Sequence, residues 1–476
     1  MPVFQGFIGG AYRARSLNFD AQRCVNLYPE KSDSGTSKAI ACLIGTPGLT
    51  TWANLSGQCV RGMRKFSDRY AFVVVGQNVY RIDSDGSFQL TGIIQYSNTP
   101  VYMESNGTLI FMATGPKGYI INPATNTLTE FTHAAFTGAG RVGFLNGSFV
   151  FNQPNTGKFW AMEPYSTTLD PLSFFTAEGS PDNIVTLLVD HTEIWLFGTE
   201  TTEVWYYTGD TSTAAYRRID GAFFEQGCAA AGSVDQMVDS LGVGAVYWLS
   251  ANDSGQGMVF RATGFQPERI STHAIERAIA SYDDISDAVA WTYQQEGHSF
   301  YVLNFPSANA TWVYDSTTGM WHERAWRQYD GKLGRHRGNC HMFFGRRNLV
   351  GDWQNGNIYD MDLDTYSDDG NSIVRLRASP HLSQGNMVIG HSSVLFEMET
   401  GTGLQQGQGK DPKALIRWSD DGGHNWSSQR ESSIGKVGSY KTQVRETRLG
   451  KSKDRVYELS ISDPIKVVIS GAYINE

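Results

Sequence analysis

The motif most specific for chemistry lies near the C-terminus, where residues 419–426 read SDDGGHNW. This stretch follows the Asp-box spacing S-x-D-x-G-x-x-W. A hydroxyl and a carboxylate at this spacing can hydrogen-bond the backbone of a tight turn, while glycine adopts positive φ and tryptophan packs beneath. We interpret Ser419, Asp421, Gly423 and Trp426 as a structural β-hairpin turn without a catalytic role.

Other acidic residues give weaker signals. Neighbouring acids occur at 283–284, 368–369 and 420–421, and we expect them to be solvated because charged residues in loops are mostly exposed. A calcium site is conceivable, but its spacing is not that of an EF-hand loop. Its candidate ligands are Asp362, Asp364, Asp368 and Asp369.

Metal and nucleophile motifs are also weak. His336, Cys340 and His341 lie close together but lack a fourth ligand, so we interpret the cluster as a coincidence within a loop. The chain has no nucleophile elbow, phosphate-binding loop, HExxH motif or dinucleotide fingerprint. We therefore expect a non-enzymatic protein with no catalytic residues, no cofactor and no bound metal.

The charge balance argues against tight binding of DNA. Lys and Arg number 39 and Asp and Glu 48, which gives a net charge of −9, whereas a protein that holds duplex DNA needs a basic face. The densest basic stretch is Arg335-His336-Arg337, with Arg346 and Arg347 nearby, and we interpret it as a solvated loop. Sequence-specific DNA binding is not expected.

The five cysteines are widely spaced and form no C-x-x-C motif, which is typical of a chain that folds in a reducing cytosol. The N-terminus lacks a basic region followed by an apolar stretch. No apolar run approaches the ~18–20 residues that a membrane-spanning helix requires. We expect a soluble protein that is made in the cytoplasm and does not enter a membrane.

The elements that must position these residues are predicted to be strands. The chain contains 51 Gly and is 12% aromatic, a composition that favours strands and tight turns over helices. Residues 70–75, for example, form an apolar run that is followed by the turn residues 76–78 and a second short run at 79–82. Such pairs indicate β-hairpins. The sequence predicts an all-β fold.

Seven segments repeat this pattern of short strands and polar turns. Five of the six intervals between them, 38 to 47 residues, lie near the ~40–45 residues of a four-stranded propeller blade, and the sixth is 61 residues. The pattern predicts a β-propeller of about seven blades; several β-sandwich domains would use the same strands and remain the competing interpretation. The repeats begin near Cys59, Ser97, Gly138, Val185, Gly227, His273 and Gly334.

Three parts follow from this pattern. Residues 1–58 are expected to form an extended segment that closes the propeller or reaches a neighbour, residues 59–370 the propeller, and residues 371–476 a C-terminal β-sandwich. The polar run 367–372 is interpreted as a linker. The clearest helical periodicity spans 273–282, with Ser271-Thr272 as the N-cap, and a second short helix is predicted at 283–288.

Several stretches, in their order along most of the chain, resemble the packaged-DNA stabilisation proteins, or tail hubs, of short-tailed bacteriophages (podoviruses). The match is weakest over the last 100 residues. The stretches are CVNLYP at 24–29 with GTPGL at 45–49, DNIV at 182–185 through TEVWYYTG at 202–209, and IERAI at 275–279 through WVYD at 312–315 and Trp321.

This resemblance implies a structural protein of the virion tail that is assembled in the host cytoplasm. It implies a homo-oligomer, typically a hexameric ring, beneath the portal and its head-to-tail adaptor. The ring would extend the DNA channel, help to retain packaged DNA and hold the tail needle or plug and the spikes or fibres. Genomic DNA would pass through without specific binding, and the net charge suggests an acidic lumen. We expect ring contacts from residues 1–55 and 371–476.

A second class of function stays open. The Asp-box also occurs in sialidases, so a carbohydrate-active propeller, either a sialidase-like hydrolase or a lectin, is the alternative. Such an enzyme needs paired acids and an arginine cluster at one end of the propeller, whereas a hub needs only surfaces.

Overall fold

The computed structural model describes residues 3–34, 36–177, 179–180, 182–210, 215–238, 242–252 and 254–475. Over these residues the secondary structure is almost entirely strands, which confirms the all-β prediction. The exceptions are one α-helix, α1 (His273–Ala280), and one 3-10 helix, η1 (Ala231–Ser233). In this part of the chain no helix is long and apolar enough to cross a membrane.

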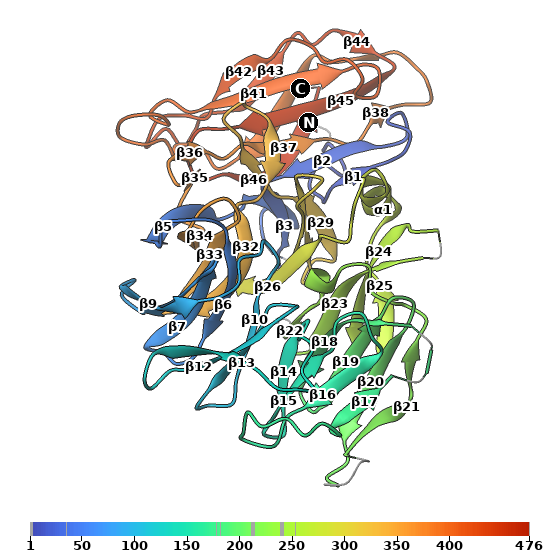
Figure 1. The fold of residues 1–476 in the computed structure, drawn as a ribbon. Helices are drawn as coiled ribbons and strands as arrows, with labels where there is room; N and C mark the ends of the chain where they lie inside the picture. The colour runs from blue at the N-terminus through green and yellow to red at the C-terminus, as the bar shows by residue number, and fades with distance from the viewer. Residues whose placement is uncertain are drawn as a thin grey trace.

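Seven antiparallel sheets form a β-propeller (Figure 1), because the first strands of neighbouring sheets contact one another around a ring. Blade one is β6 (Val60–Lys65), β7 (Tyr70–Val75), β8 (Asn78–Asp83) and β9 (Phe88–Ile93). Blade two is β10 (Tyr102–Ser105), β11 (Ile110–Ala113), β12 (Gly118–Asn122) and β13 (Thr127–Phe131). Blade three is β14 (Val142–Leu145), β15 (Ser148–Asn152), β16 (Lys158–Ala161) and β17 (Phe174–Thr176).

The remaining blades follow the same order. Blade four is β18 (Ile184–Asp190), β19 (Glu193–Gly198), β20 (Thr202–Tyr207) and β21 (Tyr216–Phe224). Blade five is β22 (Asp235–Val238), β23 (Gly244–Ala251), β24 (Gly257–Thr263) and β25 (Gln266–Arg269). Blade six is β26 (Val289–Gln295), β27 (His298–Phe305), β28 (Ala310–Asp315) and β29 (Met320–Glu323), and the hairpin β30 (Ala325–Arg327) and β31 (Leu333–Arg335) follows it.

Blade seven combines the two ends of the propeller sequence. Its first three strands are β32 (Gly338–Phe344), β33 (Arg347–Asp352) and β34 (Asn357–Asp362), and its outer strand is β5 (Gly48–Asn54) from the N-terminal part. In the antiparallel register, Met361 lies opposite Leu49. Hydrogen bonds between β5 and β34 therefore close the ring.

The apolar runs of the second strands follow from burial on both faces. Successive side chains of a strand point to opposite sides of the sheet. In β27, Phe300 and Val302 pack toward blade seven, whereas Tyr301, Leu303 and Phe305 pack toward blade five. A separate hydrophobic cluster fills each of the seven spaces between neighbouring blades.

The C-terminal domain is a β-sandwich. One sheet contains β37 (Arg375–Ala378), β45 (Asp454–Ile461), β41 (Lys413–Ser419) and β42 (Arg430–Ser433), with β38 (Leu382–Ser383) on β45. The facing sheet contains β3 (Leu27–Lys31), β4 (Ala41–Gly45), β46 (Val468–Ile474), β40 (Ser393–Met398) and β43 (Val444–Thr447). A separate two-stranded sheet, formed by β39 (Ile389–Gly390) and β44 (Lys451–Ser452), completes the domain. Phe4 and Phe7 belong to the core between the sheets.

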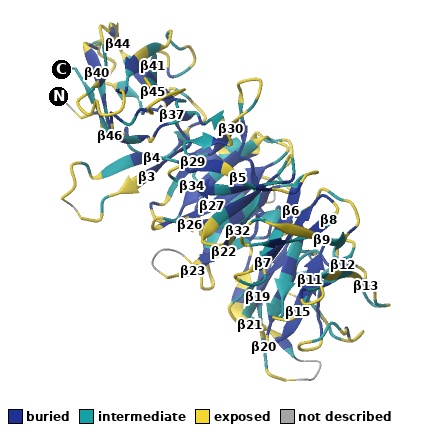
Figure 2. Ribbon diagram, turned by 90° about the vertical axis from the view of Figure 1, so that its left-hand side faces the viewer, coloured by how far each residue is buried: buried dark blue, intermediate teal, exposed yellow. Residues whose placement is uncertain are grey.

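A single continuous sheet joins the two domains. Strand β2 (Ala21–Val25), paired with β1 (Tyr12–Arg13), lies between β29 of the propeller and β37 of the sandwich. Val25 pairs in parallel with Glu323, and Cys24 lies opposite Arg377. Figure 2 shows the sandwich stacked on one side of the propeller, with β3, β4 and β37 at the junction. Residues 1–58 thus contribute strands to both domains.

Three local predictions need correction. The predicted linker at 367–372 contains β35 (Ser367–Asp368) and β36 (Asn371–Ser372), and β35 pairs with β5 at Leu49. The helix predicted at 283–288 is absent, because these residues form turns. The sixth repeat begins at Val289 rather than near His273, since α1 precedes it.

The helix itself has the predicted N-cap. The Thr272 side chain accepts a hydrogen bond from the Ile275 amide at 3.4 Å. Ala274, Ile275 and Ile279 pack into the cluster between blades five and six. On its other side the helix contacts the N-terminal segment, where the Arg277 guanidinium donates to the Ala14 carbonyl.

Candidate functional site

The Asp-box residues form one tightly hydrogen-bonded turn after β41. The Ser419 hydroxyl donates to Asp421 Oδ1 at 2.7 Å and accepts from the Gly423 amide at 2.8 Å. Asp421 also accepts from the backbone amides of His424 and Asn425 at 3.0 and 2.8 Å and from the Asn425 side chain at 2.7 Å. Gly423 has a φ of 96°. These hydrogen bonds hold the pKa of Asp421 well below its ordinary range.

The turn connects the sandwich to the N-terminal segment. Trp426 packs beside a cluster that contains Ala21 and Val25 of β2, and the Arg417 guanidinium lies 4.7 Å from its ring centroid. Asp420, the second acid of the turn, accepts from Arg455 at 2.6 and 2.8 Å. The Asp-box turn is therefore suited to a structural role, in which it fixes the backbone after β41 and packs against β2.

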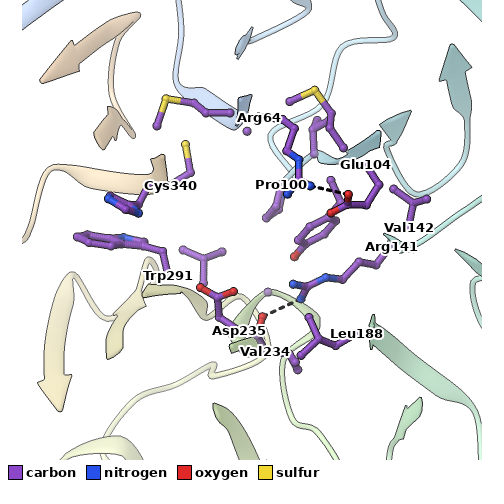
Figure 3. Close-up of a pocket in the computed structure, with 18 of the residues that line it drawn as sticks. Arg64, Pro100, Glu104, Arg141, Val142, Leu188, Val234, Asp235, Trp291 and Cys340 are labelled. Atoms are coloured by element: carbon purple, nitrogen blue, oxygen red, sulfur yellow. Dashed lines mark hydrogen bonds and ion pairs between the residues drawn. The ribbon is translucent and has the colours of Figure 1, made fainter. Parts of the chain in front are cut away.

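A cavity of about 440 Å³ lies on the propeller axis. All seven first strands, or the residues just before them, contribute to its wall. Figure 3 shows Arg64, Glu104, Arg141 and Asp235 converging on it from different blades. We call this space the axial channel.

The charged groups of the axial channel bind one another or the backbone across blades. Arg64 of blade one donates to Glu104 of blade two at 2.6 Å. Arg141, just before blade three, donates to the Val234 carbonyl at 2.7 Å, and Thr292 of blade six donates to Asp235 of blade five at 3.0 Å. Burial raises the pKa of both Glu104 and Asp235.

No sequence motif indicated these channel residues. Charged side chains on or just before the first strand of several repeats were the available signal, since that strand lines the axis of a propeller. The first strands and the residues just before them place two acids and three arginines in one channel. Each acid already has a partner within the chain, so the contacts act to hold neighbouring blades together.

Arginine side chains make specific polar contacts at the junction of the two domains. Arg23 of β2 forms a paired interaction with Glu323 of β29, at 3.0 Å from Nε to Oε1 and 2.6 Å from Nη2 to Oε2. Arg377 of β37 donates to the carbonyls of Phe7 and Gly10 at 2.7 and 2.9 Å. These contacts join the N-terminal segment to blade six through Glu323 and to the sandwich through Arg377.

The prediction that Arg335-His336-Arg337 is a solvated loop is wrong. The three residues are only 4%, 5% and 6% exposed. Arg337 is neutralised by the buried Asp352, which accepts from its Nε at 2.8 Å, and Arg335 lies 4.3 Å from the ring centroid of Trp353. Arg346 lies in the turn between β32 and β33, Arg347 begins β33, and both are exposed.

His336 is buried, whereas Cys340 and His341, which belong to β32, are half-buried. Burial lowers the pKa of His336 to about 3 and of His341 to about 4, and it raises that of the Cys340 thiol to about 12. His341 Nε2 lies 3.1 Å from Asn348 Oδ1, and His341 stacks on Trp291. Among the described residues no group of three or more His, Cys, Asp or Glu could hold a metal. All five cysteines are free thiols.

The adjacent acids differ in environment. Asp283 and Asp284 are exposed as expected, but Asp368 is buried, and burial raises its pKa to about 7. The candidate calcium ligands Asp362, Asp364 and Asp369 are exposed. Because Asp368 points into the protein, the four carboxylates do not converge on one ion.

Comparisons with known proteins match the two domains separately. Residues 5–366 match the family model for bacteriophage P22 Gp10, beta-propeller, and residues 374–476 match the model for bacteriophage P22 Gp10, beta-sandwich. No curated protein sequence matches the chain.

Among solved structures, the chain is similar to YCF48 bound to D1 peptide, with 10% identity, a TM-score of 0.42, and coverage of 67% of this chain and 98% of that one. It is also similar to the WD40 beta propeller domain of Doa1, with 10% identity, a TM-score of 0.41, and coverage of 66% and 97%. A third is the extracellular domain of the putative one component system BT4673 from B. thetaiotaomicron, with 10% identity, a TM-score of 0.45, and coverage of 81% and 47%.

Proposed function

The chain belongs to the bacteriophage P22 Gp10 family of phage structural proteins, and on this premise we propose that it is the tail hub of a short-tailed bacteriophage. In this role it forms a ring of several copies, six being the expected number, beneath the portal and its head-to-tail adaptor. The ring extends the DNA channel, helps to retain packaged DNA and anchors the needle or plug and the spikes or fibres. The observation that carries the proposal is the match of both domains, in order, over nearly the whole chain.

The junction between the domains supports a load-transmitting role. A hub must hold its contacts with the portal adaptor in a fixed position relative to its contacts with the needle and the spikes. A flexible linker between the domains would not do so. Here the sheet that begins in blade six continues through β2 into the sandwich. The half-buried Arg23–Glu323 contact adds a side-chain link.

The distribution of charge supports passage of DNA rather than its capture. In the part of the chain that the structure describes, seven arginines are buried but only five acidic residues are. The surface is therefore more acidic than the net charge of −9 suggests. An acidic surface repels phosphates, whereas tight DNA binding requires a basic one.

The contacts between copies are proposed to come mainly from the sandwich. Strands β2 to β5 of the N-terminal segment pair within the chain, which leaves its loops, such as 32–34 and 36–40, for outside contacts. In the sandwich, loops expose large apolar side chains that a neighbouring copy could cover. These are Met387, Val388, Val437 and Tyr440.

The test is the mass of the purified protein, alone and mixed with the portal and adaptor of its own virus. A discrete complex that contains several copies of this chain is the expected result. A protein that stays monomeric with every virion component would refute the hub role, and a glycan-binding and hydrolysis screen would then examine the carbohydrate-active alternative.

A matched pair of variants locates the contact between copies. Tyr440→Glu places a charge on the exposed sandwich loop, and Tyr165→Glu does the same at an exposed tyrosine of the propeller. We expect only Tyr440→Glu to weaken the complex. Equal complexes from both variants would place the contact outside this loop.

A further inference from the structure

A cavity of about 380 Å³ lies where the N-terminal segment, α1 and blade six meet at the junction of the two domains. We call this cavity the junction groove. Its wall is partly apolar, with contributions from Ala11, Ala278 and Trp312. The charged residues of the wall are Arg13, Arg23, Arg277 and Glu323.

The arginines of the junction groove carry more charge than its one acid neutralises. Arg23 pairs with Glu323 at 2.6 Å. Arg13 and Arg277 form no ion pair with any residue that the structure describes. Both are exposed, so their guanidinium groups are accessible to a partner. The groove therefore presents two positive charges that the chain itself does not neutralise.

Arg15 adds a third positive charge beside the groove. The Arg277 guanidinium donates to the carbonyl of Ala14, the residue just before Arg15. Arg15 is exposed and likewise forms no ion pair within the described part of the chain. The two acids that follow α1, at 283–284, line a different cavity. A local excess of positive charge thus occurs on a chain whose net charge is −9.

Exposed carboxylates lie together elsewhere, in residues 362–369, which we call the acidic segment. Its three exposed acids are Asp362, Asp364 and Asp369. Asp362 lies opposite Gly48 in the register between β34 and β5. The Asp369 amide donates to the Leu49 carbonyl at 2.7 Å, which brings the other end of the segment to the same place. Among the described residues none of the three carboxylates forms an ion pair.

The junction groove and the acidic segment lie on opposite sides of the molecule at the level of the domain junction. Figure 1 shows α1 and β1 on one side of this level and β35, within the acidic segment, on the other. Lys466, whose charge acts on Asp364, pairs with Glu399 at 3.1 Å rather than with the segment. Each copy therefore carries two surfaces of opposite charge that cannot neutralise each other within one chain.

We propose that the junction groove of one copy binds the acidic segment of the neighbouring copy. This inference rests on the proposed tail-hub role, since it assigns a contact within the ring. A contact between two different surfaces is heterologous, and such contacts close into a ring when the rotation between copies permits. Complementary charge fixes the orientation of the partners and disfavours wrong ones. The contact adds to the one proposed for the loops of the sandwich.

The charge distribution favours a second copy over nucleic acid as the occupant of the groove. A chain with a net charge of −9 repels a duplex, and three arginines do not make the extended basic face that DNA binding requires. The acidic segment carries a compact set of carboxylates, which match guanidinium groups through paired hydrogen bonds. Every copy in a ring brings one such segment to its neighbour.

Charge reversal on each surface tests the contact. The basic-side variant is Arg13→Glu/Arg15→Glu, and the acidic-side variant is Asp362→Lys/Asp364→Lys. Each variant is mixed with the portal and adaptor of its own virus, and mass measurement gives the complex formed at each protein concentration. Either variant alone should require at least about a tenfold higher concentration for half-maximal assembly, because like charges then meet at every contact.

An equal mixture of the two variants provides the specific readout. In an alternating ring, each Glu surface faces a Lys surface and each Arg surface faces an Asp surface, so all contacts are complementary again. The mixture should therefore reach half-maximal assembly within about twofold of the wild-type concentration. Alternation requires an even number of copies, which a ring of six satisfies.

Arg69→Glu/Arg217→Glu is the matched control, since it makes the same change in net charge as the basic-side variant at exposed arginines of blades one and four. It should assemble as the wild type does. Melting temperatures show whether each variant is folded. Where a reversal lowers the melting temperature, neutral replacements (Arg→Gln and Asp→Asn) at the same four positions take its place, and their assembly should be about threefold weaker than that of the wild type.

The outcomes separate this contact from the tail-hub role. A wild-type chain that forms no complex of several copies would refute the role and the contact with it. A wild-type ring that both variants form equally well would overturn the contact alone. Weak assembly of each variant without recovery in the mixture would mean that another anionic partner occupies the groove, and would also overturn the contact. Recovery confined to the mixture is the expected result.

Discussion

Asn26 and Ala325 exchange two hydrogen bonds although 299 residues separate them in the sequence. The Asn26 Nδ2 donates to the Ala325 carbonyl at 2.8 Å, and the Ala325 amide donates to Asn26 Oδ1 at 2.9 Å. The same Nδ2 donates to the Val374 carbonyl at 2.9 Å. One buried side chain thereby joins the N-terminal segment, the chain after blade six and the start of the sandwich.

Asn26→Ala should lower the free energy of unfolding by about 3 kcal/mol, because each buried backbone group that loses its partner costs roughly 1–3 kcal/mol. Urea-induced unfolding measures the change. Asn146→Ala is the matched control, since Asn146 is exposed and also has a positive φ of 49°. The free energy of unfolding of Asn146→Ala should fall by no more than about 1 kcal/mol. Equal losses would mean that backbone strain, rather than the hydrogen bonds, governs the effect.

Ser419→Ala tests the Asp-box as a structural turn. The buried hydroxyl of Ser419 links Asp421 to the Gly423 amide, so its loss should lower stability by about 1 kcal/mol. Differential scanning calorimetry should show a lower melting temperature. Ser428→Ala, an exposed serine after the turn, should leave it unchanged. A Ser419→Ala protein as stable as the wild type would contradict the structural role.

Asp368 should make stability depend on pH. Its folded pKa is about 7 against an ordinary 3.8, so the folded chain holds the proton more tightly than the unfolded chain. The stability that it contributes is full below about pH 4 and is lost as the pH rises to about 7. The free energy of unfolding of Asp368→Asn, relative to that of the wild type, should therefore rise with pH over this window. The slope should be at most about 1.4 kcal/mol per pH unit.

The comparison with Asp368→Asn is needed because buried histidines act in the opposite direction. The lowered pKa values of His336, His341 and His391 reduce stability as the pH falls below about 6.5. Asp369→Asn, which removes the exposed neighbouring carboxylate, is the matched control. If wild type and Asp368→Asn give parallel curves of unfolding free energy against pH, the assignment to Asp368 is wrong.

Arg337→Met should destabilise the protein by about 3–5 kcal/mol, because it leaves the fully buried Asp352 without its counter-charge. The double variant Arg337→Met/Asp352→Asn should recover part of this loss. Chemical unfolding of four proteins, the wild type, Arg337→Met, Asp352→Asn and the double variant, completes a double-mutant cycle that gives the coupling. Additive losses would show that the two side chains do not stabilise each other.

Regular elements of this fold were predictable because their signals are local. The apolar run at 70–75 and the turn at 76–78 predict β7 and the hairpin that follows, and Thr272 predicts the start of α1. The repeat spacing predicts the propeller, which is confirmed. Such patterns depend on neighbours a few residues away.

Burial of charge could not be read from the sequence in the same way. Arg337 appears in a basic, loop-like stretch, and only the folded chain places Asp352 and Trp326 against it. Asp368 lies in an apparently solvated run, yet it pairs with a strand from the N-terminal segment. The axial channel is likewise created by closure of the ring. In each case the deciding partner is distant in the sequence.

The pairing of the first strands with the last strands also controls when the protein can fold. Leu43 of β4 pairs with Ile469 of β46, so a strand that is synthesised early waits for one that is synthesised more than 400 residues later. At ~5–20 residues per second, translation takes about 20 to 80 s to bridge that distance. A chain that stops early lacks β46 and leaves β4 with an open edge. The sheet that contains β4 can therefore form only after β46 has been synthesised.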